Sequence, residues 1–86
     1  MKKIICMIRP FEAEQKLYVS EDDNRLDIVS APIDNLNDTI LALVEKYNTT
    51  QVDFVGPKTY NQQIANELKD INVTKYNNRK LVVNVI

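Results

Sequence analysis

The sequence predicts a mixed α/β domain with the element order β-β-β-α-β-α-β, and three observations predict it. Short apolar runs rich in β-branched residues alternate with polar turns, which is typical of strands. Two longer segments repeat their apolar residues every three or four positions, which indicates amphipathic helices. The 86 residues have the size of one domain, so we expect residues 1–86 to share a single core.

Three strands are expected before the first helix. The run Ile4–Ile8 is continuously apolar, as in a central strand that is covered on both faces. Two further strands, beginning near residue 15 and at Leu26, flank the polar cluster 21–24 and therefore form a hairpin. Within the third strand, Asp27 is expected to face outward.

The first helix is expected to end near Tyr47. Its apolar stripe consists of Leu36, Ile40, Leu43, Val44 and Tyr47. Asp34 or Asn35 can cap its first turn, because a short polar side chain accepts a bond from a free backbone N–H group.

A fourth strand, a second helix and a last strand complete the chain. The fourth strand covers 52–55 and stops at Gly56-Pro57. Thr59–Gln62 fits a capping box at the start of the second helix, whose apolar face runs to Ile71. Residues 73–76 are expected to form an extended link or a strand edge, and 77–79 a turn. The last strand is expected over 81–86.

Helical crossovers between parallel strands are nearly always right-handed, which restricts the arrangement of the sheet. The most economical arrangement places the first strand in the centre. We therefore expect the strand order 3-2-1-4-5, with the second strand antiparallel to the rest.

This order of elements resembles the ribonuclease H-like fold of RuvC-type resolvases, YqgF-type nucleases and actin-like ATPases. The resemblance covers nearly the whole chain as topology and includes no sequence motif. It implies that active members bind two divalent cations with an Asp in the first strand and an acid at the end of the fourth. Such a metal pair stabilises the attacking and leaving oxygens of phosphoryl transfer.

The residues at those positions do not fit the metal chemistry that the resemblance implies. The run Ile4–Ile8 contains no acid, and Val55 and Gly56 stand at the end of the fourth strand. The chain has no histidine, and Cys6 is its only cysteine, expected to be an inert core thiol. We therefore expect no catalytic residue, no metal site and no cofactor.

A metal-dependent nuclease with displaced carboxylates remains the alternative enzymatic reading. Its acids would come from Glu12 and Glu14, with Glu21 or Asp53.

A small basic and aromatic cluster lies near the end of the chain. It consists of Lys75, Tyr76, Arg79 and Lys80. Such residues can stack on and neutralise a single-stranded nucleic acid. The net charge of -1 and the pI of about 5.3 leave no broad basic surface, so any such binding is expected to be weak.

The last strand offers a different contact, because an edge strand with unpaired backbone groups can recruit a partner. Its candidate interaction residues are Val83, Val85 and Ile86. The substitution Val83→Lys or Val85→Lys is expected to weaken a dimer. One of the two positions is expected to face the core, where the change would unfold the protein instead. If both helices cover one face of the sheet, the other face would expose residues such as Ile5, Met7, Val52 or Val83.

These patterns predict a small non-catalytic interaction or assembly module that acts through protein–protein contacts. The partner is expected to be a second copy, in a homodimer, or a host protein. The use of 10 Asn, 9 Ile and 8 Lys against 3 Arg and 4 Ala favours a phage or mobile element of an AT-rich bacterium. The first apolar run is too short for a signal peptide or a membrane helix, so a cytoplasmic protein without membrane contact is expected.

Overall fold

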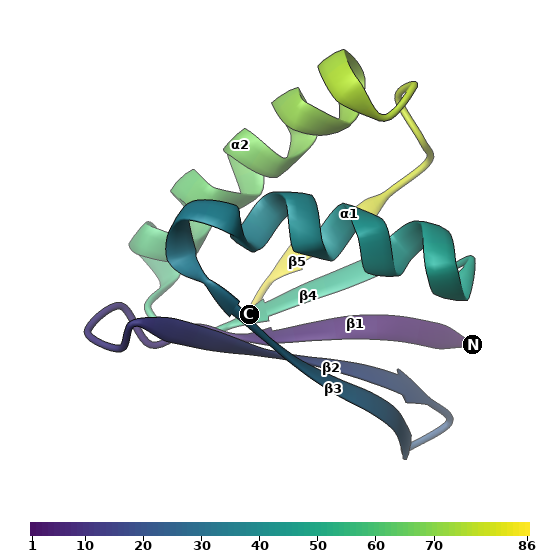
Figure 1. Cartoon of the computed structure of the whole chain (residues 1–86), viewed down its shortest axis with the longest axis horizontal. Helices are drawn as coiled ribbons and strands as arrows, with labels where there is room; N and C mark the ends of the chain where they lie inside the picture. The colour runs from purple at the N-terminus through teal and green to yellow at the C-terminus, as the bar shows by residue number, and fades with distance from the viewer.

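The computed structural model describes the whole chain, residues 1–86, as one five-stranded sheet with two α-helices and a short 3₁₀ helix. In chain order the elements are β1 (Lys2–Met7), β2 (Glu14–Glu21), β3 (Asn24–Pro32), η1 (Ile33–Asn35), α1 (Leu36–Tyr47), β4 (Gln51–Val55), α2 (Lys58–Lys75) and β5 (Val82–Val85). The strand order is β3-β2-β1-β4-β5 (Figure 1). β2 is antiparallel to both neighbours, and β4 is parallel to β1 and to β5. The predicted topology is therefore confirmed.

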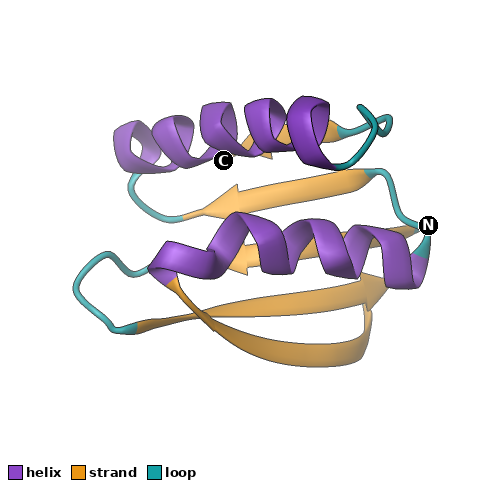
Figure 2. Ribbon diagram, turned by 45° about the horizontal axis from the view of Figure 1, so that its top comes forward, coloured by secondary structure: helices purple, strands orange, loops and turns teal.

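Both helices lie on the same face of the sheet, so the protein has two layers (Figures 1 and 2). The core fills the space between them. Its buried apolar residues are Ile4, Cys6, Ile8, Leu17, Val19, Ala31, Leu36, Ile40, Leu41, Leu43, Val44, Val52, Phe54, Ile64, Ala65 and Leu68. The opposite face of the sheet, which no helix covers, is called the open face below.

The central strand β1 is covered on one face only, which corrects the expectation of a strand buried on both. Ile4 and Cys6 are fully buried beneath the helices, whereas Ile5 and Met7 lie half-buried on the open face. The prediction that Ile5 and Met7 occupy an uncovered face is confirmed. The same prediction for Val52 is wrong, because Val52 pairs with Ile4 and is fully buried beneath the helices.

The turn predicted over 21–24 joins β2 to β3. Asp22 and Asp23 adopt positive φ values of 49° and 67°, as a two-residue hairpin turn requires. Asp and Asn tolerate this backbone region better than most residues. The N-terminal amine donates a 3.0 Å hydrogen bond to Asp22.

Asp27 faces the helices, not the solvent as expected. Its register with β2 explains this, because Asp27 lies opposite the core residue Val19. The Tyr47 hydroxyl donates a 2.6 Å bond to Asp27 Oδ2, and the Ile28 N–H group donates a 2.8 Å bond to Oδ1. These bonds, Tyr47 first, lower the pKa of Asp27 below its ordinary value.

The ends of α1 agree only in part with the sequence. The helix ends at Tyr47 as predicted, and Asn48 closes it in the left-handed conformation with φ 51°. At its start, the 3₁₀ turn η1 precedes it, and Asn35 is the N-cap residue without a side-chain cap bond. The expected cap from Asp34 or Asn35 is therefore wrong, because a continuous turn of backbone already leads into the helix.

The predicted capping box of α2 does not form. Pro57 is the N-cap residue, and Thr59 is already the second residue of the helix, two positions too late to cap it. The Asn61 N–H group donates its 2.9 Å bond to the Pro57 carbonyl oxygen. The proline ring supplies a fixed φ at this boundary instead of a capping side chain.

Thr59→Ala is therefore expected to leave the free energy of unfolding within about 0.5 kcal/mol of the wild type, as is usual for an exposed residue. A capping residue would cost about 0.5–2 kcal/mol when replaced by alanine. Urea unfolding of the two proteins separates these outcomes. A loss near 1 kcal/mol would show that Thr59 caps the helix in solution.

At its other end, α2 extends to Lys75, so residues 73–75 are helical and not an extended link. The β-branched residues Val73 and Thr74 are only mildly unfavourable in a helix, and tertiary contacts can outweigh this low helix propensity. The buried Asn72 supplies such contacts, because its side chain bonds both the carbonyl oxygen and the N–H group of Arg79, at 2.7 and 3.1 Å. The predicted turn at 77–79 is confirmed, with Asn77 and Asn78 at positive φ. Neither helix combines the length and the apolar character needed to cross a membrane.

Candidate functional site

The open face is the most unusual surface of the molecule, because each of the five strands places an apolar side chain on it. Strand register places these residues on it: Lys3, Ile5, Met7, Lys16, Tyr18, Ile28, Gln51, Asp53, Val55, Val82 and Asn84. Ile28 at one edge is 45% exposed, and Val82 at the other edge is 49% exposed. A sheet face that meets water usually carries polar residues in alternation with the buried ones. Here much of that face is apolar.

A polar cluster interrupts this apolar surface beside β1. Asp53 is only 5% exposed, although it lies on the open face. Its carboxylate accepts bonds from Asn84 Nδ2 at 2.9 Å and Gln51 Nε2 at 3.2 Å, and Lys3 Nζ lies 3.6 Å away. The carboxylate is thus satisfied by three neighbouring side chains, as a buried charge must be. We call Lys3, Gln51, Asp53 and Asn84 the Asp53 cluster.

Cys6 lies on the other side of the sheet, within the core. Burial raises the pKa of its thiol far above the ordinary value, and the negative charge of Asp53 raises it further. The thiol is therefore neutral and inaccessible. This confirms the prediction of an inert core thiol.

The acids considered for a displaced metal site stay apart from one another. Glu12 pairs with Arg9, with 3.6 Å between Oε1 and Nη1, while Asp53 pairs with Lys3. Glu14 is exposed at the start of β2. No three carboxylate or thiol groups lie close enough together to share a metal ion.

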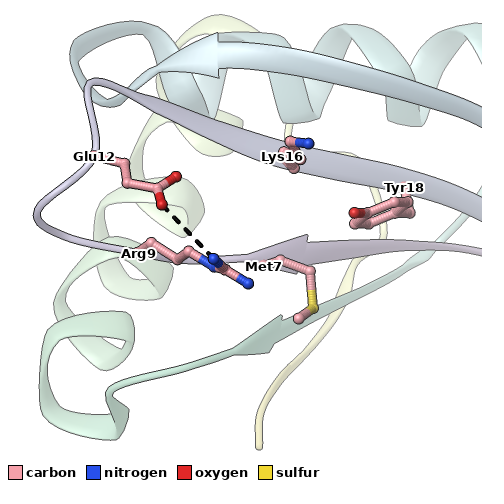
Figure 3. Close-up of a pocket in the computed structure, with 5 residues that line it drawn as sticks. All are labelled: Met7, Arg9, Glu12, Lys16 and Tyr18. Carbon is pink, nitrogen blue, oxygen red and sulfur yellow. Dashed lines mark ion pairs between the residues drawn. The ribbon is translucent and has the colours of Figure 1, made fainter.

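A shallow hollow of about 220 Å³ lies at the end of the open face, where β1 and β2 diverge. Five residues line it: Met7, Arg9, Glu12, Lys16 and Tyr18. Figure 3 shows Met7 and Tyr18 on adjacent strands, with the Arg9–Glu12 pair at the loop end. Arg25 lies over the Tyr18 ring at 5.8 Å from its centroid, a cation–π arrangement. We call this feature the β1–β2 hollow.

The loop beside the β1–β2 hollow is fixed by one buried side chain. Gln15 Oε1 accepts a 2.6 Å bond from the Arg9 N–H group, while its Nε2 donates to the carbonyl oxygens of Arg9 and Glu12 at 2.9 and 3.0 Å. The Glu12 N–H group also donates to the Arg9 carbonyl oxygen at 3.0 Å. Between these anchors, Phe11 is fully exposed.

Phe11 and Gln15 were not among the residues that the sequence analysis singled out. An aromatic residue in a short polar segment, outside any apolar repeat, is the signal that could have identified Phe11. Gln15 offered no such signal, because its role depends on the path of the loop backbone above it.

The interaction residues predicted in the last strand have two different environments. Val83 and Val85 pair with Val52 and Phe54, and their side chains pack partly buried against the core. The expectation that only one of the two faces the core is wrong, since residues two apart in a strand share a face. The same register rules out Val83 as a residue of the uncovered face. Ile86 remains exposed at the end of the strand.

The basic cluster predicted near the end of the chain is also divided. Tyr76 packs against the core, and its hydroxyl lies 3.4 Å from Asp38 Oδ1. Partial burial and the charge of Asp38 raise the pKa of this tyrosine. Its ring is therefore only partly available to stack on a base. Arg79 and Lys80 line a separate shallow hollow with Lys69, and Lys75 is exposed on the last turn of α2.

No protein-family model matches the sequence, and no curated protein matches it. Among solved structures, the chain is similar to a protein from Bacteroides thetaiotaomicron that is described as having an actin-like ATPase fold and unknown function. The two share 16% identity with a TM-score of 0.70, over 99% of this chain and 32% of the other. The chain thus spans about a third of the length of that protein. At this identity the likeness shows the fold, and it matches the actin-like and ribonuclease H-like arrangement that the element order resembles.

Proposed function

We propose that the protein is a non-catalytic interaction or assembly module that binds a protein partner, first of all a second copy, through its open face. One observation carries the proposal: the apolar side chains of this face have no layer above them. A sheet face that is apolar is normally buried against another element. A large apolar surface that remains exposed is a common mark of a protein–protein contact.

The composition of the open face supports a protein partner. Ile5, Met7, Tyr18 and Val55 form its middle, and Ile28 opposite Tyr18 extends it to the β3 edge. Val82 at the β5 edge is separated from this middle by the Asp53 cluster. Charged side chains surround this middle, with Lys3 on β1, Lys16 on β2 and Arg25 over Tyr18. An apolar centre with a polar rim is the usual composition of a protein interface.

The proposal includes no catalytic role, because of the surroundings of Asp53. Asp53 is the one acid in β4, and Lys3, Gln51 and Asn84 already occupy its oxygens. Its side chain also lies on the open face and not at the ends of β1 and β4. The proposal keeps the origin and location expected from the sequence, a phage or mobile element and the cytoplasm.

Weak binding of single-stranded nucleic acid is the alternative function. Lys69, Arg79 and Lys80 around one shallow hollow favour it, since several cations close together can neutralise phosphates. The partial burial of Tyr76 reduces its stacking surface, which lowers the expected affinity. Binding to a labelled oligonucleotide at several salt concentrations tests this function directly.

Ile28→Lys is expected to weaken self-association, because it places an unpaired charge in the apolar contact. Ile28 is already 45% exposed, so its replacement should leave the fold intact. Sedimentation velocity over a range of concentrations compares the wild type with this variant. Val73→Lys is the matched control, because Val73 is 59% exposed on α2, in the other layer.

We expect the wild type and Val73→Lys to associate as concentration rises, and Ile28→Lys to stay monomeric at the same concentrations. Equal association of all three proteins would contradict the assignment of the contact to the open face. A single 9.9 kDa species up to high micromolar concentration would exclude self-association and leave only a heterologous partner.

A further inference from the structure

Phe11 is the most exposed large apolar residue of the chain, more so than Ile28 or Val82 on the open face. Single exposed apolar residues are common on protein surfaces and need no explanation by themselves. Phe11 differs in its setting, because it stands on a loop whose backbone is held on both sides of it. That setting gives a fixed presentation of an aromatic ring to solvent.

The rigidity of the loop comes from Gln15, which is 1% exposed. Its side chain forms three hydrogen bonds to the backbone of Arg9 and Glu12, the residues that flank Phe11 at two and one positions. The Arg9–Glu12 ion pair spans the same loop. A loop held in its binding conformation loses little entropy on association, so an aromatic residue on it is an efficient anchor.

The β1–β2 hollow beside this loop has the chemistry to accept an aromatic ring. Met7 offers a polarisable sulfur atom, and Tyr18 offers a ring edge or face. Arg9 and Lys16 supply cations at the margin, which are attracted to the face of a ring. Figure 3 shows these side chains around the same opening.

Phe11 of the same chain does not occupy this hollow, since it is fully exposed. The anchor and the hollow nevertheless lie side by side, because Arg9 and Glu12 belong both to the loop and to the lining. A two-fold axis next to the loop would bring Phe11 of each copy to the β1–β2 hollow of the other copy. Such self-complementary contacts are the ordinary basis of small homodimers.

We propose that Phe11 of one copy inserts into the β1–β2 hollow of a second copy, and that the second copy returns the same contact. The proposal rests on the self-association proposed above and specifies its anchor and its receiving site. The loop end of the open face is then the centre of the dimer, and the apolar residues toward β3 and β5 surround it.

Phe11→Ala tests the anchor without disturbing the fold, because the ring makes no buried contact. The dissociation constant of the dimer is expected to rise at least about tenfold, as for an aromatic hot-spot residue. Val73→Ala is the control and is expected to leave this constant unchanged. Sedimentation equilibrium gives the constant, and urea unfolding shows that all proteins remain equally stable.

A disulfide test locates the receiving site. Phe11→Cys is mixed under mild oxidation with a size-tagged Lys16→Cys variant, and in parallel with a size-tagged Val73→Cys variant. The native Cys6 is buried and does not interfere. A mixed disulfide with Lys16→Cys, at a level well above that with Val73→Cys, is expected.

The outcomes separate this inference from the proposed function. If Phe11→Ala associates as tightly as the wild type while Ile28→Lys stays monomeric, the reciprocal anchor is wrong and the open face remains the contact. Equal cross-linking of Lys16→Cys and Val73→Cys would also overturn the anchor. If the wild type never associates, the anchor is excluded, whereas a heterologous partner on the open face is still permitted.

Discussion

Gly56→Ala is expected to lower the free energy of unfolding by about 3 kcal/mol, from two separate effects. Gly56 adopts φ +141°, a region that residues with a Cβ atom rarely occupy. Forcing such a residue into that region costs roughly 1–3 kcal/mol. A Cβ atom here would also lie 2.6 Å from the carbonyl oxygen of Ile8, well inside van der Waals contact.

The surroundings of Gly56 leave little room for relief. The Ile8 N–H group donates a 2.9 Å bond to the Val55 carbonyl oxygen, which ties the end of β1 to the end of β4. The fully buried Asn61 lies on another side, with its Nδ2 atom 3.4 Å from the same Cβ position. A shift of either neighbour would disturb the junction from which α2 starts.

Urea unfolding of Gly56→Ala and of Lys58→Ala measures the effect, with Lys58 as an exposed neighbour. Lys58→Ala is expected to stay within about 0.5 kcal/mol of the wild type. A domain of this size has a total stability on the order of 4–13 kcal/mol, so the glycine variant should still fold but lose a large share of its stability. A loss below 1 kcal/mol would show that the backbone at Gly56 can relax.

The sequence was sufficient for the order of elements because periodicity and turn residues mark each of them. Gly56-Pro57 marked the end of β4, although only the structure shows the approach of Ile8 that requires glycine. Helix starts were predicted less well. Thr59 fits a capping motif in sequence, yet Pro57 is the N-cap residue, so the motif begins two positions after the true cap.

The sequence predicts only in part which faces of the sheet the helices cover. Ile4–Ile8 is apolar at every position, and such a run is equally consistent with one covered face or with two. The choice depends on both helices crossing on the same side, which is a property of the whole sheet (Figure 2). Ile5 and Met7 were placed correctly on the open face, whereas Val52 required the register with Ile4.

The candidate site also depends on contacts between residues that are far apart in the sequence, which no local sequence pattern predicts. The Asp53 cluster joins three strands, and its members are dispersed along the chain. Gln15 acts on a loop six residues away through its side-chain amide. Neither arrangement has a spacing that identifies it in one sequence.

Val83→Lys is expected to unfold the protein and not merely to dissociate a dimer. Val83 lies opposite the fully buried Val52 and packs against the core beneath the helices. Lysine at this position loses the apolar contact and brings a charge without a partner toward the core. A loss of about 2 kcal/mol or more in the free energy of unfolding is expected.

Val82→Lys is the matched control, because it makes the same change one residue earlier in the same strand. Val82 lies on the open face and is 49% exposed, so its lysine ammonium can remain in water. Its stability should stay within about 0.5 kcal/mol of the wild type. Urea unfolding at a protein concentration below that of self-association compares the two variants on the monomer alone.

The comparison distinguishes a contact through the edge strand from a contact through the open face. If Val83→Lys stays folded and as stable as Val82→Lys but no longer associates, then Val83 contributes to a contact along β5 and does not pack against the core. If Val83→Lys unfolds while Val82→Lys stays folded and associates less, β5 contributes its outer side chains to the interface. The second result is expected, because alternation along the strand assigns Val83 to the core and Val82 to the open face.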